Sequence, residues 1–191
     1  LVIDILNPEI KQSADFGTLG NNVLQHNREN LWANLQARKA AAPINYFSPF
    51  LTNHDQNRLM LSLNNDMNKA KIAASLLLTT PGTLYLYYGE EIGLSQYKTG
   101  DDQYRRAIMQ WSDDASAGFN TTAKFWLDQG KWFPWAQNHE GWFTHYWQGL
   151  QGKGLTVAAQ SADENSLLNH YKRLIAVRNA YPILQQPTEV R

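Results

Sequence analysis

The sequence predicts an α/β fold in which parallel strands end together at one edge of a sheet. Two short runs of strand-forming residues, 44–52 and 83–88, are rich in aromatic and aliphatic side chains. A helix-like segment lies between them, and each run leads directly into polar residues. Strand, helix and strand joined by short turns form the βαβ unit of parallel sheets, whose active sites lie at the carboxyl ends of the strands.

The composition is that of a folded protein with its own core. The chain has 191 residues, of which 43% are hydrophobic, 12% aromatic and 18% charged, and 17 basic residues balance 17 acidic ones. The zero net charge argues against nucleic acid or an anionic membrane surface as a partner, and no apolar run reaches the ~18 residues of a transmembrane helix. The absence of cysteine excludes disulfides, thiol catalysis and Cys-based zinc sites.

The first half of the chain predicts a helix followed by a strand. Residues 29–42 carry leucine and alanine at helical spacing and stop at Pro43. Residues 44–52 then have strand-forming character, although Pro49 lies inside the run and proline is awkward in a central strand. The run leads straight into an Asn-His-Asp triplet.

A second helix and a second strand follow. Asn65 or Asp66 is the expected N-cap of a helix over residues 67–79, and Pro81 with the glycine after it ends that helix. Residues 83–88 read Thr-Leu-Tyr-Leu-Tyr-Tyr, which predicts a strand that leads into two glutamates.

The last part of the chain predicts a long irregular region and one more helix. Residues 97–160 are rich in Gly, Asp, Asn and Trp and show little periodicity, as in a functional loop region. Ser161 and Glu164 have the spacing of a capping box, which predicts a helix from Ser161 to Tyr181.

The polar cluster after the first strand is the leading candidate site. Asn53, His54, Asp55 and Arg58 together could hold a polyhydroxylated ligand, because a carboxylate accepts hydrogen bonds and an imidazole donates one. The structural alternative is that Asp55 and Arg58 form a loop ion pair while His54 packs at the strand end.

Glu90 and Glu91 follow the second strand and form a second candidate. Either could serve as a general acid or base; the alternative is that one caps the next turn and the other is solvated. Adjacent strand residues point to opposite faces, so these two are not expected to be the facing carboxylate pair of a retaining glycosidase.

The aromatic side chains of the loop region have two interpretations. They either stack on sugar rings or form the region's own small core; they are Trp132, Phe133, Trp135, Trp142, Phe143, Tyr146 and Trp147. The aspartate pairs at 101–102 and 113–114 do not match the ligand spacing of a calcium loop, so no metal site is assigned.

Three segments, in order along the chain, resemble motifs of the α-amylase family of glycoside hydrolases (family 13 type). Residues 49–58 resemble its fourth conserved stretch at the end of barrel strand seven, and residues 81–93 resemble its eighth-strand segment. Residues 105–111, followed by 117–119, are similar to a loop of its oligosaccharide-cleaving bacterial members. The ordered set implies a partial TIM (β/α)8 barrel, namely its last strands and helices with a long aromatic-rich loop region.

The resemblance implies roles for the polar cluster. Asp55 would be the third catalytic carboxylate, which holds sugar hydroxyls and helps to distort the ring toward the oxocarbenium-like transition state. His54 and Asn53 would bind the same sugar, and Arg58 would be an auxiliary substrate-binding residue. The implied reaction is retaining hydrolysis of α-1,4 linkages in α-glucans or maltooligosaccharides.

The chain lacks the family's nucleophile motif, Gly-x-Arg-x-Asp, and its acid/base glutamate segment, so the chain alone is expected to be inactive. Residues 1–191 are accordingly expected to be the C-terminal part of the barrel, with its N-terminal half and the C-terminal β-sandwich outside the chain. Two alternatives remain open: a non-catalytic carbohydrate-binding module that uses the Trp-rich loops, and a scaffold relative.

The resemblance also bears on partners, cofactors and location. The expected partner is an α-glucan or maltooligosaccharide, and exposed strand edges predict self-association. No cofactor is expected; the family allows calcium in the complete enzyme, and the chain offers no recognised ligands for it. The resemblance favours a secreted or periplasmic location.

Overall fold

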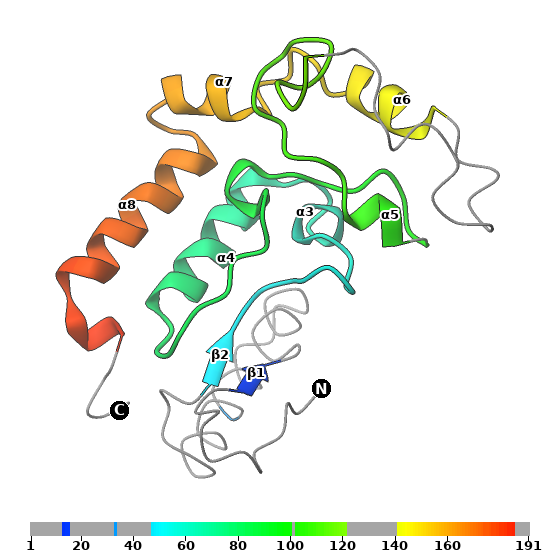
Figure 1. Ribbon diagram of the computed structural model, residues 1–191. Helices are drawn as coiled ribbons and strands as arrows, with labels where there is room; N and C mark the ends of the chain where they lie inside the picture. Colours follow the sequence, from blue (N-terminus) through cyan, green and yellow to red (C-terminus); the bar gives the residue numbers. More distant parts are fainter. Residues whose placement is uncertain (1–12, 16–32, 34–46, 101, 122–140, 186–191) are drawn as a thin grey trace.

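The computed structural model describes residues 13–15, 33, 47–100, 102–121 and 141–185 (Figure 1). Two strands, β1 (Ser13–Asp15) and β2 (Phe47–Pro49), pair in parallel, with Ser13 opposite Phe47 and Asp15 opposite Pro49. The parallel pairing agrees with the α/β prediction. The strand expected over 44–52 is three residues long where it is described, and Pro49 is its last residue. The helix expected over 29–42 lies outside the described residues except for Ala33, which is helical.

The second expected strand, over residues 83–88, is not formed. Residues 83–88 are extended but do not form a strand, because the segment makes one backbone bond to β2, from the Tyr85 amide to the Pro49 carbonyl at 3.0 Å. Tyr85 and its neighbour Leu86, whose side chains alternate across the segment, are both exposed. The residues are strand formers, but among the described residues the ladder is not continued, and although Leu84 packs against the main core, Tyr85 and Leu86 stay exposed.

The helix expected over 67–79 is confirmed. Helix α4 (Met67–Thr79) begins at the N-cap Asp66, whose carboxylate accepts hydrogen bonds from the amides of Asn68 and Lys69. The short helix α3 (Leu59–Ser62) precedes it. After α4 the chain is extended at Thr80 and turns at Gly82, where φ is 105°.

The expected helix from Ser161 to Tyr181 is two helices, α7 (Val157–Ala162) and α8 (Leu167–Ala180), followed by a 3-10 turn, η4 (Pro182–Leu184). The capping-box prediction at Ser161 is wrong because the chain caps its helices elsewhere. Thr156 caps α7 and Ser166 caps α8. The Ser166 hydroxyl accepts a bond from the Asn169 amide and donates one to the Gln160 carbonyl, which joins the two helices.

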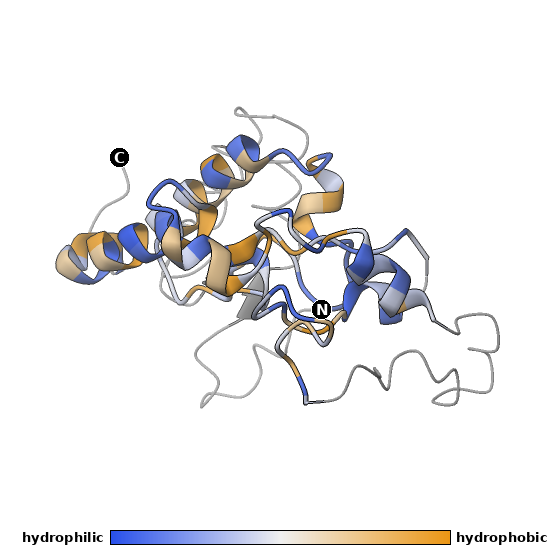
Figure 2. Cartoon of the chain, turned by 90° about the horizontal axis from the view of Figure 1, so that it is seen from above, coloured by the Kyte–Doolittle hydropathy of each residue, from blue (hydrophilic) through white to orange (hydrophobic). Residues whose placement is uncertain are grey.

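Helices α4 and α8 lie side by side and enclose the main core (Figures 1 and 2). Small residues at helical spacing on α4, Ala70, Ala73 and Ala74, let α8 approach closely, and Tyr171 of α8 is buried in the same cluster. In the view from above, apolar residues gather in the middle of the molecule (Figure 2). No helix of the described ranges is long and apolar enough to cross a bilayer.

The region expected to be irregular, residues 97–160, contains two helices besides the start of α7 where it is described. These are α5 (Asp102–Arg105) and α6 (Trp142–Gln148). Helix α6 puts aromatic residues at helical spacing on its buried side, and four of them join a second core cluster: Trp142, Phe143, Tyr146 and Trp147. For these four the core interpretation is confirmed and sugar stacking is wrong. Trp132, Phe133 and Trp135 lie outside the described residues.

Candidate functional site

The candidate site is the turn that follows β2. Phe50, Leu51 and Thr52 are buried after the strand, and the chain then turns out to the surface at Asn53. The side-chain oxygen of Asn53 accepts a hydrogen bond from the Asp55 amide at 2.9 Å. The backbone carbonyl of Asn53 accepts one from the Gln56 amide at 3.3 Å. Asparagine favours such turns because its side chain can bond to the backbone two residues ahead.

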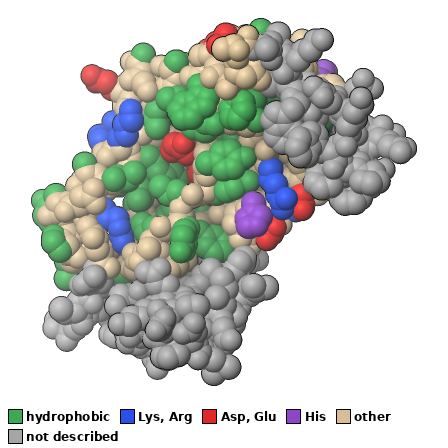
Figure 3. All heavy atoms as spheres, viewed as in Figure 1, with side chains coloured by type: hydrophobic (Ala, Val, Ile, Leu, Met, Phe, Trp, Pro, Cys, Tyr) green, Lys and Arg blue, Asp and Glu red, His purple; other side chains and the backbone are tan. Residues whose placement is uncertain are grey.

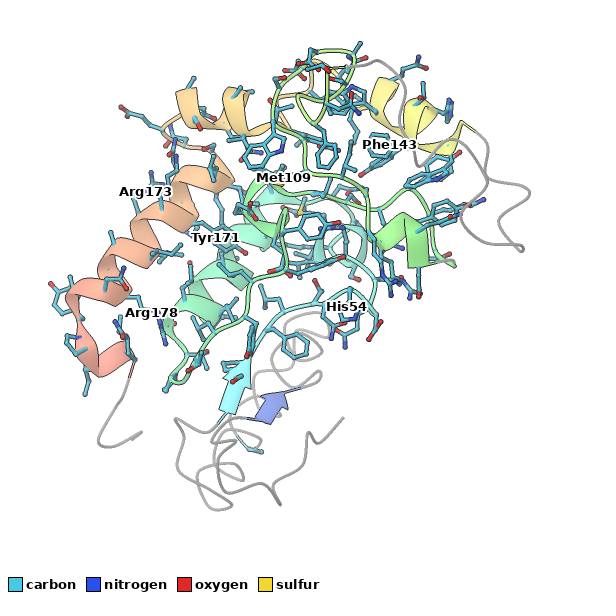
Figure 4. The ribbon with its side chains drawn as sticks, in the orientation of Figure 1. His54, Met109, Phe143, Tyr171, Arg173 and Arg178 are labelled. Carbon is cyan, nitrogen blue, oxygen red and sulfur yellow. The ribbon has the colours of Figure 1, made fainter. Side chains whose placement is uncertain are left out.

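This turn exposes the two side chains of the site that are best suited to bind a ligand, those of His54 and Asp55. The side chains of His54 and Asp55 are 62% and 59% exposed, and His54 Nε2 lies 3.4 Å from Asp55 Oδ1. Figure 4 shows His54 on the segment that leaves β2. In the space-filling view a histidine lies beside basic and acidic side chains at the edge of an apolar surface (Figure 3). The arrangement offers acceptors and a donor to a hydroxylated ligand.

The ion pair expected between Asp55 and Arg58 is wrong. The cation beside Asp55 is Arg106, whose Nη2 lies 3.3 Å from Asp55 Oδ1. Arg58 immediately precedes α3, and its side chain turns into the interior, where it is 1% exposed. A side chain so deeply buried cannot also reach the exposed carboxylate.

Arg58 instead links the site to two later segments. Its Nε donates to the Arg105 carbonyl and its Nη1 to the Tyr88 carbonyl, each at 2.7 Å. Its guanidinium also lies 4.3 Å from the ring centre of Tyr87 and 4.6 Å from that of Tyr88, within the range of cation–π attraction. In this structure Arg58 positions the turn; its role as a substrate ligand stays a prediction.

Gln96 holds the other side of the turn and was not expected from the sequence. Its buried Oε1 accepts a bond from the Arg58 amide at 2.7 Å. Its Nε2 donates to Asn57 Oδ1 at 3.1 Å and to the Lys98 carbonyl at 2.8 Å. A lone glutamine in a loop carries no local signal for this role, because its partners are fixed by the fold.

Two arginines and an aspartate complete the surface of the site, and sequence analysis assigned them no role. Asp102 and Arg105 belong to α5, and Arg106 directly follows it. Their i, i+3 and i, i+4 spacing was the available signal, since residues so placed lie on one helical face. What the spacing does not show is that this face meets the turn at His54 and Asp55.

Glu90 does not fit the structural alternative, and its role as a general acid or base stays a prediction. Glu90 lies in the short 3-10 turn η2 (Glu90–Ile92) and is 3% exposed, so it is neither a solvated residue nor a surface cap. Its Oε1 accepts a 2.6 Å bond from the Thr52 hydroxyl. Burial raises the pKa of the Glu90 carboxyl from 4.5 to about 8, against the Thr52 hydrogen bond and the Arg58 charge, which lower it, while Glu91 raises it further. The carboxyl therefore stays largely protonated at neutral pH.

Among the described residues, no group of three or more histidine or acidic side chains could hold a metal ion. Asp102 pairs with arginines, and the loop aspartates Asp113 and Asp114 accept hydrogen bonds from nearby amides and hydroxyls. Asp101 lies outside the described residues.

Comparison with known proteins identifies the family. A family model described as "Alpha amylase, catalytic domain" matches residues 10–187. Alpha-amylase 3 of Dictyoglomus thermophilum is 33% identical over 129 residues, which cover 68% of this chain and 21% of that protein. Alpha-amylase SusG of Bacteroides thetaiotaomicron is 34% identical over 136 residues, which cover 71% of this chain and 16% of that protein.

Solved structures agree with this match. The crystal structure of the alpha-amylase from H. orenii superposes with a TM-score of 0.64 at 28% identity, over 92% of this chain and 33% of that one. The described elements fit part of a (β/α)8 barrel. The chain spans only about a fifth of the length of the curated relatives that it matches. The chain therefore belongs to the family of the alpha-amylase catalytic domain.

Proposed function

We propose that this chain is the part of an α-glucan-active glycoside hydrolase that carries the transition-state-stabilising carboxylate, Asp55. The observation that carries the proposal is the exposed His54–Asp55 pair, held on a turn at the carboxyl end of β2. The names of the relatives, alpha-amylases and an oligo-1,6-glucosidase, support a glucan or maltooligosaccharide as substrate.

The chemistry assigned to the turn is binding rather than bond cleavage. An ionised Asp55 accepts hydrogen bonds from sugar hydroxyls, and His54 and Asn53 offer donors to the same ring. Such contacts accelerate hydrolysis only where they are stronger to the distorted, oxocarbenium-like sugar than to the ground state. The nucleophile and the acid/base of a retaining mechanism are proposed to come from barrel segments upstream of this chain, so the 191 residues alone should be inactive.

The test measures reducing sugar released from maltoheptaose by a longer polypeptide that carries this chain and by the 191-residue chain alone. We expect activity in the first and none in the second. Asp55→Asn should lower kcat/KM by at least about 100-fold, the scale of a lost transition-state interaction. Asp113→Asn, an exposed aspartate on the 111–121 loop, is the matched control.

Each part of the proposal has its own contrary result. An inactive longer polypeptide would contradict glucan hydrolysis. Equal activities of Asp55→Asn and Asp113→Asn would contradict the role of Asp55. Release of sugar by the 191-residue chain, lost on Asp55→Asn, would contradict the division of roles between this chain and upstream segments.

Self-association is a second part of the proposal. The extended segment around Tyr85 has exposed side chains on both faces and one backbone bond to β2, which supports pairing with another chain. Light scattering after size exclusion should show dimers or larger species, and Leu86→Lys should reduce them by placing a charge on the segment. A monomer at all concentrations would contradict this part.

A further inference from the structure

We propose that Asp102 is a positioning residue for the Asp55 carboxylate, on which it acts through Arg106. The inference rests on the proposed function of Asp55 and names the residue that controls its geometry. It is carried by a set of hydrogen bonds that connects the α5 helix to the turn after β2.

Asp102 binds both arginines at once. Its Oδ1 accepts a bond from Arg105 Nη1 at 2.9 Å, and its Oδ2 accepts one from Arg106 Nη2 at 3.0 Å. The helical spacing of three and four residues brings the two guanidinium groups to one carboxylate. Each oxygen of Asp102 thus holds one arginine.

The same two arginines reach the turn at different places. Arg106 Nη2 lies 3.3 Å from Asp55 Oδ1, and its Nε donates to the His54 carbonyl at 3.4 Å. Arg105 Nη1 donates to the Asp55 carbonyl at 3.0 Å. One arginine therefore contacts the carboxylate of Asp55 and the other contacts its backbone.

Asp102 matters because it fixes where the guanidinium of Arg106 lies. The Arg106 side chain is 43% exposed, and a long exposed side chain gains rotamer freedom when it loses a partner. Arg105 is better fixed, because its Nη2 also donates to the Gly100 carbonyl at 3.0 Å. The geometry between Asp55 and Arg106 thus depends on the second carboxylate.

Asp102 also limits how strongly Arg106 binds Asp55. Both Arg106 and His54 approach Oδ1 of Asp55, and among the described residues Oδ2 accepts no hydrogen bond. Without the Asp102 charge, Arg106 is free to pair with Asp55 through two bonds, the preferred geometry of arginine with a carboxylate. That pairing would occupy the oxygen that the sugar hydroxyls need.

The test uses the longer polypeptide that hydrolyses maltoheptaose. Asp102→Asn should lower kcat by about 10- to 100-fold, the cost of misplacing a group by about 1 Å, with a change in KM below about threefold. Asp102→Glu keeps the charge and should recover most of the lost kcat. Asp113→Asn removes an exposed charge elsewhere and should retain the wild-type rate.

A double-mutant comparison separates positioning from a general structural effect. Because Asp102 acts through Arg106, Asp102→Asn should change kcat by less than about twofold in an Arg106→Ala background. If wild type is active and Asp102→Asn matches Asp113→Asn, or if the effects of Asp102→Asn and Arg106→Ala multiply, the inference is wrong while the proposed function stands. An inactive wild type overturns the proposed function, and the inference with it.

Discussion

The hydroxyl of Thr52 donates a 2.6 Å hydrogen bond to the carboxyl of Glu90, 38 residues further along the chain. The bond connects the end of the β2 segment to the turn that follows the extended 83–88 segment. It lies in the interior, because both side chains are buried.

Stability should fall as pH rises because of Glu90. Its folded pKa of about 8 lies above the ordinary value of 4.5, so between these values the folded state holds a proton that the unfolded state has lost. The contribution is complete below about pH 4.5 and is lost as pH rises to about 8. Glu90→Gln should therefore flatten the decline in unfolding free energy, measured by urea titrations from pH 5 to 8.5. Parallel profiles of variant and wild type would contradict the shifted pKa.

Arg58→Lys should destabilise the chain by about 2 to 4 kcal/mol, because a lysine cannot reproduce two charge-assisted bonds and ring stacking together. Arg58 bonds to the carbonyls of Tyr88 and Arg105 from a buried position. Arg173→Lys is the control, since Arg173 is exposed and bonds only to the Glu164 carbonyl within the described residues. Equal urea midpoints for the two variants would show that Arg58 is not a structural link.

Gly89→Ala should cost more stability than Gly152→Ala. Both glycines have positive φ, 85° and 71°, so both variants pay about 1 to 2 kcal/mol for a left-handed backbone. A Cβ at Gly89 would also lie 2.6 Å from Leu94 Cδ2, whereas nothing lies within 4 Å at Gly152. The overlap should add about 1 to 3 kcal/mol. Thermal unfolding of the two variants measures the difference, and equal losses would exclude the close approach to Leu94.

Trp147→Ala should cost about 3 to 5 kcal/mol, as expected for an aromatic residue removed from a core. Trp147 is 1% exposed and its indole donates to the Asp114 carbonyl at 3.0 Å. Trp111→Ala should cost less than half as much, because about half of that side chain is already exposed. Chemical unfolding compares them; a stable Trp147→Ala chain with weakened glucan binding would restore the sugar-stacking interpretation.

Local patterns predicted the parts of the fold that local interactions decide. Helix α4 begins after Asp66 and ends at Thr79 as expected, because the spacing of its alanines, its cap and Pro81 all agree. The predicted start of the last helix was wrong because Ser161 and Ser166 both have the chemistry of a cap. The choice of Ser166 depends on its bond to the Gln160 carbonyl.

The other features of the fold and the site depend on contacts between distant segments, so local patterns could not predict them. Strand character in residues 83–88 is local, but a ladder needs partners that the segment itself does not specify. In the candidate site, Asn53, His54 and Asp55 could be proposed from the sequence because they follow a strand together. That Arg58 turns inward, and that Arg106 takes its place beside Asp55, depends on segments some 50 residues away.

Arg178 makes the turn after α4 depend on a side chain about 100 residues further along the chain. Its side chain points from α8 toward the end of α4 and donates to the carbonyls of Leu78, Thr80 and Gly82 (Figure 4). These bonds close loops of 96 to 100 residues, whose entropic cost is met before the contacts form. During synthesis, α4 therefore emerges long before the side chain that binds the carbonyls of Leu78, Thr80 and Gly82. A chain that is released before Arg178 has been added lacks the donor for these three carbonyls.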